Sequence, residues 1–262
     1  MPGQPSDSIR MPVLHKAVTV IANAKKQYAK SKMTMEQKQL IKTARLAGMW
    51  YLILAISGVF GFMIFHPQIF VSDDPQKTLN NLINLVSISR IRLLFELVII
   101  FSQALAAVWF YKLFCDINKW AASTIGIWGT VNSVAIMISA IAMSSAIEIA
   151  SSSSLVFQEK VISIELLVNI ITNAWSVGGL FFGLWLIPMG HIVITSGRMP
   201  IWLGRILIMG GIGYILQTFI NCLGVQSSYV NVLVIPASVG EFWMIGYLLI
   251  YGIRPAINSE KQ

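Results

Sequence analysis

The chain has 262 residues, of which 56% are hydrophobic and only 11% are charged, and its mean hydropathy is +0.71. Average soluble domains contain about 25% charged residues, so this composition excludes an ordinary soluble domain. The net charge of +8 comes mainly from residues 1–42. These residues lack the interleaved aromatic side chains that stack on bases, so no nucleic-acid partner is expected.

Six apolar stretches occupy nearly everything after Arg45. Each is close to the ~20 residues that a helix needs to cross about 30 Å of hydrocarbon. The stretches cover residues 46–65, 93–114, 121–143, 166–189, 201–223 and 230–253. This pattern predicts an all-α, polytopic membrane protein with a six-helix transmembrane bundle over residues 43–254. A basic amphipathic arm over residues 1–42 precedes the bundle, and a short cytoplasmic tail over residues 255–262 follows it.

The distribution of lysine and arginine predicts the orientation of the bundle. Basic residues beside membrane spans are retained on the cytoplasmic side. With the N-terminus inside, nine basic residues up to Arg45 and six later ones fall inside. Four fall outside, namely Lys77, Arg90, Arg92 and Lys160. We therefore expect an integral membrane protein with both termini in the cytoplasm.

The arm has an amphipathic pattern of its own. Its apolar residues at helical spacing are Val13, Leu14, Val18 and Ile21. The basic residues that could point toward anionic lipid headgroups are Lys16, Lys25, Lys26, Lys30 and Lys32. This pattern favours an arm that lies on the cytoplasmic leaflet, with the lipid bilayer as its partner. The alternative is a solvated tail that only enforces the topology.

Proline, glycine and serine mark the connections between the spans. The connection over residues 67–89 could hold a short surface helix at residues 79–85, and the serine-rich residues 144–160 predict a flexible or weakly helical segment. Pro188 is expected to end the fourth helix ahead of a tight hairpin through Gly197 and Pro200. Close packing of the fourth and fifth spans is expected at Gly178, Gly179, Gly183, Gly210, Gly211 and Gly213.

The remaining chemistry-bearing residues favour neither a metal site nor an enzyme. Cys115 falls at the inner end of the second span and Cys222 at the outer end of the fifth. The expected distance between them is therefore far beyond the ~7 Å between Cα atoms that a disulfide allows. His15, His66 and His191 are scattered, so no metal and no cofactor are expected. The spans contain no paired aspartates, and the chain has no Gly-x-Ser-x-Gly or His-Glu-x-x-His motif. Most tryptophans lie near span ends, where they usually anchor a helix at the interface.

Polar side chains recur at helical spacing inside four spans, although such groups are costly in hydrocarbon. Arg92 and Glu96 are one turn apart and can pair. Given the orientation above, the polar residues that fall in the outer half of the membrane are Arg92, Glu96, Asn169, Asn173, Gln217, Asn221, Ser238 and Glu241. This agreement in depth predicts an outward-opening polar pocket, with Glu96 and Glu241 as ligand or proton sites and Arg92 as the partner of a carboxylate. The alternative is that these residues only form hydrogen bonds between helices.

Several motifs in the spans carry a resemblance to a known family. They are Gly183-Leu184-Trp185-Leu186-Ile187-Pro188-Met189-Gly190, Ser196-Gly197, Pro200, Leu203-Gly204, Gly211, Gly213-Tyr214, Ala44-Arg45-Leu46-Ala47-Gly48, Pro236, Glu241 and Tyr251-Gly252. Over residues 43–254 the chain resembles a family of bacterial multi-pass membrane proteins known only as a domain of unknown function. The resemblance implies six spans in the bacterial cytoplasmic membrane, and it brings no activity or catalytic residues with it.

Three classes of function are compatible with these observations. The first is noncatalytic ligand handling, as a receptor-like protein or small transporter, through the outer polar pocket. The second is an accessory subunit that packs against a larger membrane complex. The third is an intramembrane enzyme, which the lack of a catalytic motif makes the weakest of the three. The sequence slightly favours the first class, and it identifies neither the small-molecule ligand nor the membrane-protein partner.

Overall fold

A computed structural model describes residues 10–225 and 228–255, and within residues 10–33 it describes only the backbone, except at Gln27. Over these ranges every regular element is helical. The elements are α1 (Arg10–Gly58), the π-helix η1 (Val59–Phe65), α2 (His66–Ile69), α3 (Pro75–Asn84), α4 (Val86–Phe114), α5 (Lys119–Ser151), α6 (Phe157–Ser196), α7 (Ile201–Cys222), the 3₁₀-helix η2 (Ser228–Val234) and α8 (Ile235–Ile250).

Six helical segments in the described part of the chain are long and apolar enough to cross a membrane. They are Thr34–Ile69, Val86–Phe114, Lys119–Ser151, Phe157–Ser196, Ile201–Cys222 and Tyr229–Ile250. The predicted all-α, six-span fold is therefore confirmed. Of the two alternatives for residues 144–160, a flexible or a weakly helical segment, the structure agrees with the helical one over most of the range, because α5 continues to Ser151 and α6 begins at Phe157.

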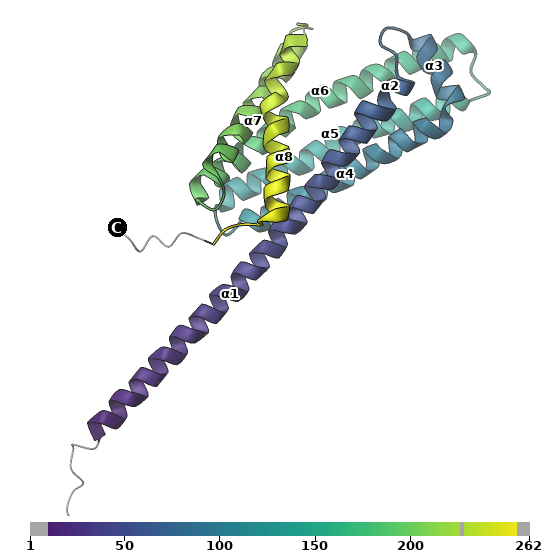
Figure 1. Cartoon of the computed structure of the whole chain (residues 1–262). Helices are drawn as coiled ribbons and strands as arrows, with labels where there is room; N and C mark the ends of the chain where they lie inside the picture. The colour runs from purple at the N-terminus through teal and green to yellow at the C-terminus, as the bar shows by residue number, and fades with distance from the viewer. Residues whose placement is uncertain (1–9, 226–227, 256–262) are drawn as a thin grey trace, which may run out of the picture.

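The six spans form a closed ring. Each of α1, α4, α5, α6, α7 and α8 contacts the next along the chain, and α8 returns to contact α1. Figure 1 shows that the α7–α8 hairpin lies close to the other spans where α1 leaves the bundle. The distance between the hairpin and α1 grows toward the end of the bundle that carries α2 and α3. We call the end of the bundle where α1 leaves it the basic end, and the end that carries α2 and α3 the distal end.

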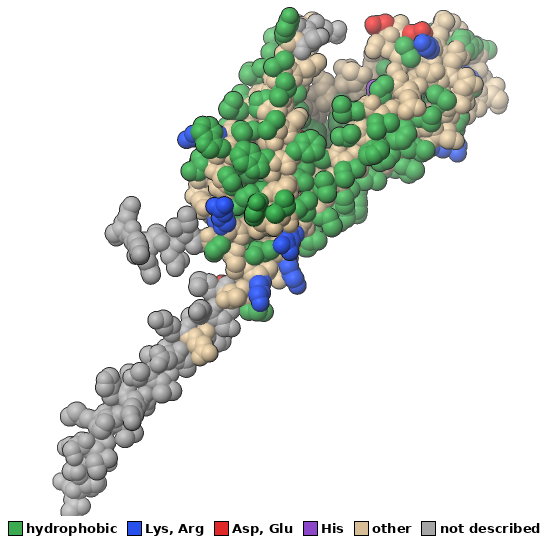
Figure 2. All heavy atoms as spheres, in the orientation of Figure 1, with side chains coloured by type: hydrophobic (Ala, Val, Ile, Leu, Met, Phe, Trp, Pro, Cys, Tyr) green, Lys and Arg blue, Asp and Glu red, His purple; other side chains and the backbone are tan. Residues whose placement is uncertain are grey.

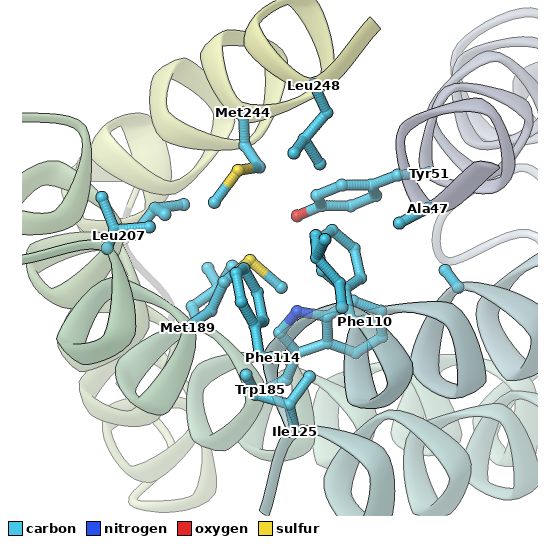
Figure 3. Packing of buried hydrophobic residues seen from close by; sticks show 14 of the residues in the cluster. Ala47, Tyr51, Phe110, Phe114, Ile125, Trp185, Met189, Leu207, Met244 and Leu248 are labelled. Carbon is cyan, nitrogen blue, oxygen red and sulfur yellow. The ribbon is translucent and has the colours of Figure 1, made fainter. Parts of the chain in front are cut away.

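Hydrophobic side chains from opposite sides of the ring meet in the core near the basic end. Figure 3 shows Tyr51 of α1, Phe110 of α4, Trp185 and Met189 of α6 and Met244 of α8 pointing toward one another. A second buried cluster lies at the distal end, where the short helix α3 buries Leu79 and Leu82 against α5 and α6. The predicted surface helix therefore exists, begins earlier at Pro75, and is part of the core.

The C-terminal end of the described chain meets the first span and the α6–α7 connection at the basic end. The Gln37 side-chain amide donates to the Ile253 carbonyl oxygen at 2.7 Å, and the Arg254 backbone N–H donates to the Arg198 carbonyl oxygen at 3.3 Å. Figure 2 shows basic side chains gathered where α1 leaves the bundle. Lys112 and Arg198 line one crevice here with Glu36. The structure therefore groups basic residues at the second and fourth connections between spans, and after the last span, at one end of the bundle.

The helix α1 runs without a break from Arg10 through the first span to Gly58. It continues along the line of the span away from the bundle (Figure 1). The side chains of Lys16, Lys25, Lys26, Lys30 and Lys32 lie outside the described residues. The contact of these lysines with lipid headgroups stays a prediction.

The prediction that Pro188 ends the fourth helix is wrong. The helix α6 passes through Pro188 and ends at Ser196, where Gly197 adopts a left-handed backbone with φ of 63°. Close packing on α7 continues past the proline, because a Cβ added at Gly190 would lie 2.5 Å from the Gly204 carbonyl oxygen. Proline removes one backbone donor, and this packing keeps the helix continuous beyond it.

Glycines bring α6 and α7 together as predicted, but not all of them serve that contact. A Cβ added at Gly183 would lie 2.5 Å from the Gly211 carbonyl oxygen, so the two backbones are nearly in contact there. Gly210 instead faces Ala237 of α8, and Gly213 faces the backbone of Leu233 in η2. The glycines of α7 therefore seat a helix on each side of it.

Candidate functional site

A cavity of about 150 Å³ lies inside the ring, between the first, second, fourth, fifth and sixth spans. We call it the aromatic cavity. Its lining residues are Tyr51, Leu54, Ala55, Gly58, Phe62, Ile99, Trp175, Phe182, Tyr214, Glu241, Phe242 and Ile245. Figure 2 shows the surface hollowed between the α7–α8 hairpin and the other spans toward the distal end. The polar side chains of the lining are few, and the only carboxylate among them is Glu241.

Glu241 of α8 is held by a tyrosine of α1, the neighbouring span in the ring. The Tyr51 hydroxyl donates to Glu241 Oε1 at 2.8 Å across 190 residues of sequence. Figure 3 shows the Tyr51 hydroxyl directed into the centre of the bundle. Its ring is packed edge-on against Phe110, with 5.6 Å between centroids. A rigid aromatic side chain therefore orients one oxygen of the carboxylate.

An irregular turn in the first span forms the distal wall of the cavity. Residues Val59–Phe65 form a π-helix, which is rare and often occurs at functional sites because it redirects side chains within a helix. Phe62 in this turn packs edge-on against Trp175 of α6, with 4.1 Å between ring centroids. Phe182, two turns after Trp175 in α6, stacks on Tyr214 of α7 with 5.6 Å between ring centroids. The walls are thus pairs of interlocked rings from different spans.

Behind Trp175 lies a fully buried charge network. Arg92 and Glu96 form an ion pair within α4, as predicted from their spacing, and each is only 1% exposed. The Ser139 hydroxyl of α5 donates to Glu96 Oε1 at 2.5 Å, and the Trp175 indole N–H donates to the same oxygen at 3.0 Å. The Arg92 guanidinium lies over the Phe62 ring, 5.1 Å from its centroid. The network neutralises both charges within the bundle.

Trp175 connects the buried network to the aromatic cavity. Its indole N–H reaches Glu96 and also lies 3.1 Å from the Ser139 hydroxyl oxygen, while its ring lines the cavity and contacts Phe62. It packs against both hydrophobic clusters. Of the two carboxylates that the sequence singled out, Glu96 therefore binds the indole N–H outside the lining and Glu241 lines the cavity, so they do not share a site.

The structure does not bring the eight predicted pocket residues together. Glu241 alone among them lines the aromatic cavity, and Arg92 and Glu96 lie behind its wall. Asn169 lines a separate polar hollow of about 250 Å³ at the distal end, with Asp73, Asp74 and Glu165 among its neighbours. Gln217 donates to the Asn231 side-chain oxygen at 2.9 Å, as expected for a hydrogen bond between neighbouring segments. The side chains of Asn173, Asn221 and Ser238 are exposed.

Sequence reasoning missed the aromatic residues of the site. The sequence predicts that most tryptophans are interface anchors, whereas Trp175 lies in the middle of the fourth predicted span. An anchor is placed near a span end, so the midspan position of Trp175 was the available signal. Tyr51 likewise lies well inside the first span, where a phenolic hydroxyl needs a partner. Among the described residues, no group of three histidine, cysteine or acidic side chains could hold a metal ion.

Comparison with known proteins identifies the family of the chain and nothing closer. No curated protein and no solved structure matches it. A family model with the description "Domain of unknown function (DUF4386)" matches residues 46–252, which include the described core of all six spans. The match covers most of the chain and every residue that lines the aromatic cavity. This membrane protein therefore belongs to the DUF4386 family, whose function is unknown.

Proposed function

We propose that the chain is a noncatalytic ligand-handling protein that binds a small, mostly apolar molecule in the aromatic cavity. The observation that carries this proposal is the Glu241 carboxylate, which faces a space otherwise lined by aromatic and aliphatic side chains within the membrane bundle. Among the described residues it receives one hydrogen bond, from Tyr51. Carboxylates inside membrane spans are costly and usually functional. Ligand pockets typically combine apolar walls with a few placed polar groups, as this cavity does.

We also propose that the basic end faces the cytoplasm of a bacterial cell, in the cytoplasmic membrane. The support is the grouping of Lys112, Arg198 and Arg254 at the end where α1 leaves the bundle, together with the arm's own basic residues. Basic residues beside spans are retained on the cytoplasmic side. In this orientation the hollow between the α7–α8 hairpin and the other spans opens toward the outer leaflet.

Two glycines provide a matched test of ligand binding in the cavity. A Cβ added at Gly58 or at Gly246 meets no atom within 4 Å, so a larger side chain fits at either position. Gly58 lines the aromatic cavity, whereas Gly246 does not. Gly58→Leu should therefore fill the cavity, and Gly246→Leu should leave it open.

The experiment is to purify the protein and both variants gently from native membranes and to identify by mass spectrometry what accompanies each. A small molecule that accompanies the wild type and Gly246→Leu, and is lost from Gly58→Leu, supports the proposal. A stoichiometric protein partner retained by all three proteins, with no small molecule, contradicts it. That result would identify an accessory subunit of a larger membrane complex.

A further inference from the structure

We infer that the aromatic cavity selects a small organic ammonium ion. This inference rests on the proposed function, since it names the class of ligand that the cavity takes. Its basis is the combination of one carboxylate, Glu241, with six aromatic side chains in the lining. The aromatic residues are Tyr51, Phe62, Trp175, Phe182, Tyr214 and Phe242. The faces of aromatic rings attract cations, and rings of this kind are the usual site for quaternary ammonium groups.

The charges around the cavity disfavour an anionic ligand. Among the described residues, no lysine, arginine or histidine lines it. Arg92 lies outside the lining, over the Phe62 ring, and is paired with Glu96. An anion would therefore meet the Glu241 carboxylate with no compensating cation.

A neutral apolar ligand and a metal ion also fit less well than an organic cation. A neutral ligand would exclude water from Glu241 and leave its charge unpaired in an apolar space, which is costly. A metal ion such as Ca²⁺ takes six to eight oxygen ligands, whereas among the described residues Glu241 is the only carboxylate in the lining, and the other side-chain oxygens there are two tyrosine hydroxyls. An ammonium ion with carbon substituents satisfies both the carboxylate and the rings.

The rings do not contribute equally to this selection. The Arg92 guanidinium already lies over the Phe62 ring, and its positive charge weakens the attraction of that ring for a second cation. Phe182 has no such neighbour and stacks on Tyr214 at the cavity wall. The volume of about 150 Å³ equals that of an apolar protein cavity that holds benzene. The selected group is therefore a small ammonium headgroup rather than a whole lipid.

The test uses two probes of the same shape that differ in charge, choline and its uncharged carbon analogue 3,3-dimethylbutan-1-ol. Binding of each to the full chain is measured by titration calorimetry in dodecyl maltoside, a detergent that has no ammonium group, with empty micelles subtracted. We expect the cation to bind at least about tenfold more tightly than its neutral analogue, because only the cation pairs with the carboxylate.

Two substitutions assign the selectivity to the cavity. Glu241→Gln should weaken binding of the cation by about tenfold or more and leave the neutral analogue within about threefold. The exposed carboxylate of Glu148, outside the cavity, provides the matched control, and Glu148→Gln should change neither affinity. Phe182→Leu keeps Glu241 and removes one ring face, so it should weaken the cation by about threefold and leave the neutral analogue nearly unchanged. This second variant decides the question if Glu241→Gln does not fold.

The outcomes separate this inference from the proposed function. Equal binding of both probes, unaffected by Glu241→Gln or Phe182→Leu, overturns the ammonium class and leaves ligand binding in the cavity standing. The class is also overturned if neither probe binds while Gly58→Leu still loses an accompanying small molecule. If neither probe binds and no small molecule accompanies the wild type, both proposals fail.

Discussion

At the scale of single residues, the interior of the bundle accommodates charge by satisfying each group with several partners. Glu96 accepts hydrogen bonds from Arg92, one turn earlier in α4, from Ser139 of α5 and from Trp175 of α6. Removing one partner of a buried ion pair leaves an uncompensated charge, whereas removing both leaves none. The buried pair therefore predicts a specific pattern of stabilities.

We expect Arg92→Met to lower the free energy of unfolding by about 3–5 kcal/mol, because it leaves Glu96 charged and unpaired. The double variant Arg92→Met with Glu96→Leu should lose less than Arg92→Met alone. In that variant the Trp175 indole N–H can still donate to the Ser139 hydroxyl oxygen, which lies 3.1 Å away. Unfolding in detergent measures both, with exposed Arg90→Met as the control. A double variant that is no more stable than Arg92→Met alone would contradict the pairing argument.

Tyr51 provides a second test at this scale. Tyr51→Phe keeps the ring that packs on Phe110 and removes only the hydroxyl that donates to Glu241. A charged group that loses a hydrogen-bond donor in a low-dielectric site costs about 1–3 kcal/mol, so the unfolding free energy should fall by that amount. The exposed Tyr111 gives the matched control, and Tyr111→Phe should have little effect. Equal stability of the two variants would show that the Tyr51 hydroxyl does not hold the carboxylate.

At the scale of elements, two irregularities and one glycine seam position the cavity. The π-helix of the first span places Phe62 against Trp175. The 3₁₀-helix η2 approaches Gly213 so closely that its Leu233 carbonyl takes the place of a side chain. The seam between α6 and α7, at the pairs Gly183–Gly211 and Gly190–Gly204, fixes the spacing of the two helices that carry Phe182 and Tyr214.

Substitution in the seam should destabilise the bundle, and the same substitution elsewhere should not. A Cβ at Gly190 would lie 2.5 Å from the Gly204 carbonyl oxygen and 2.7 Å from Ile208 Cγ1, so Gly190→Ala forces the helices apart. We expect it to lower the unfolding free energy by about 1–3 kcal/mol, the usual cost of overpacking. At Gly246 an added Cβ meets nothing within 4 Å. Gly246→Ala should therefore stabilise α8, by up to about 1 kcal/mol.

Thermal unfolding midpoints in detergent measure both glycine variants. A gain in stability for Gly190→Ala would mean that α6 and α7 are not in close contact at this position.

At the scale of the whole molecule, an even number of spans arranged in a closed ring returns the chain to the end where it entered. The contacts of Gln37 with Ile253 and of Arg254 with Arg198 bring the start of the first span and the segment after the last span together. Cys115 follows α4 at this basic end, whereas Cys222 ends α7 at the other end of the bundle. The two free cysteines therefore report on opposite faces of the membrane.

Cysteine labelling tests the proposed orientation. With the basic end in the cytoplasm, an impermeant maleimide should label Cys222 in right-side-out membrane vesicles and Cys115 only in inside-out vesicles. The single variants Cys115→Ser and Cys222→Ser assign the label, and their combination should take none. The reverse pattern would place the basic end outside and overturn the orientation inferred from the distribution of lysine and arginine.

Much of the fold could be predicted from local sequence. Hydrocarbon requires about 20 apolar residues per crossing, and this requirement acts on each stretch independently of the others. The pairing of Arg92 with Glu96 was predictable for the same reason, since one helical turn separates them. The extent of α6 was not, because packing at Gly190 and Gly204 carries the helix past Pro188.

The sequence by itself determined the class of the protein, its six spans and which residues carry charge within them. Only the tertiary structure decided which of these residues share a site, because helical periodicity places a side chain on a face and leaves open how that face is turned toward its neighbours. Tyr51 meets Glu241 across 190 residues, and Trp175 meets Glu96 across 79. The close approach of backbones at the glycine seam sets how α6 and α7 face each other. In the folded bundle the predicted polar pocket is divided into a buried charge network and an aromatic cavity with one carboxylate.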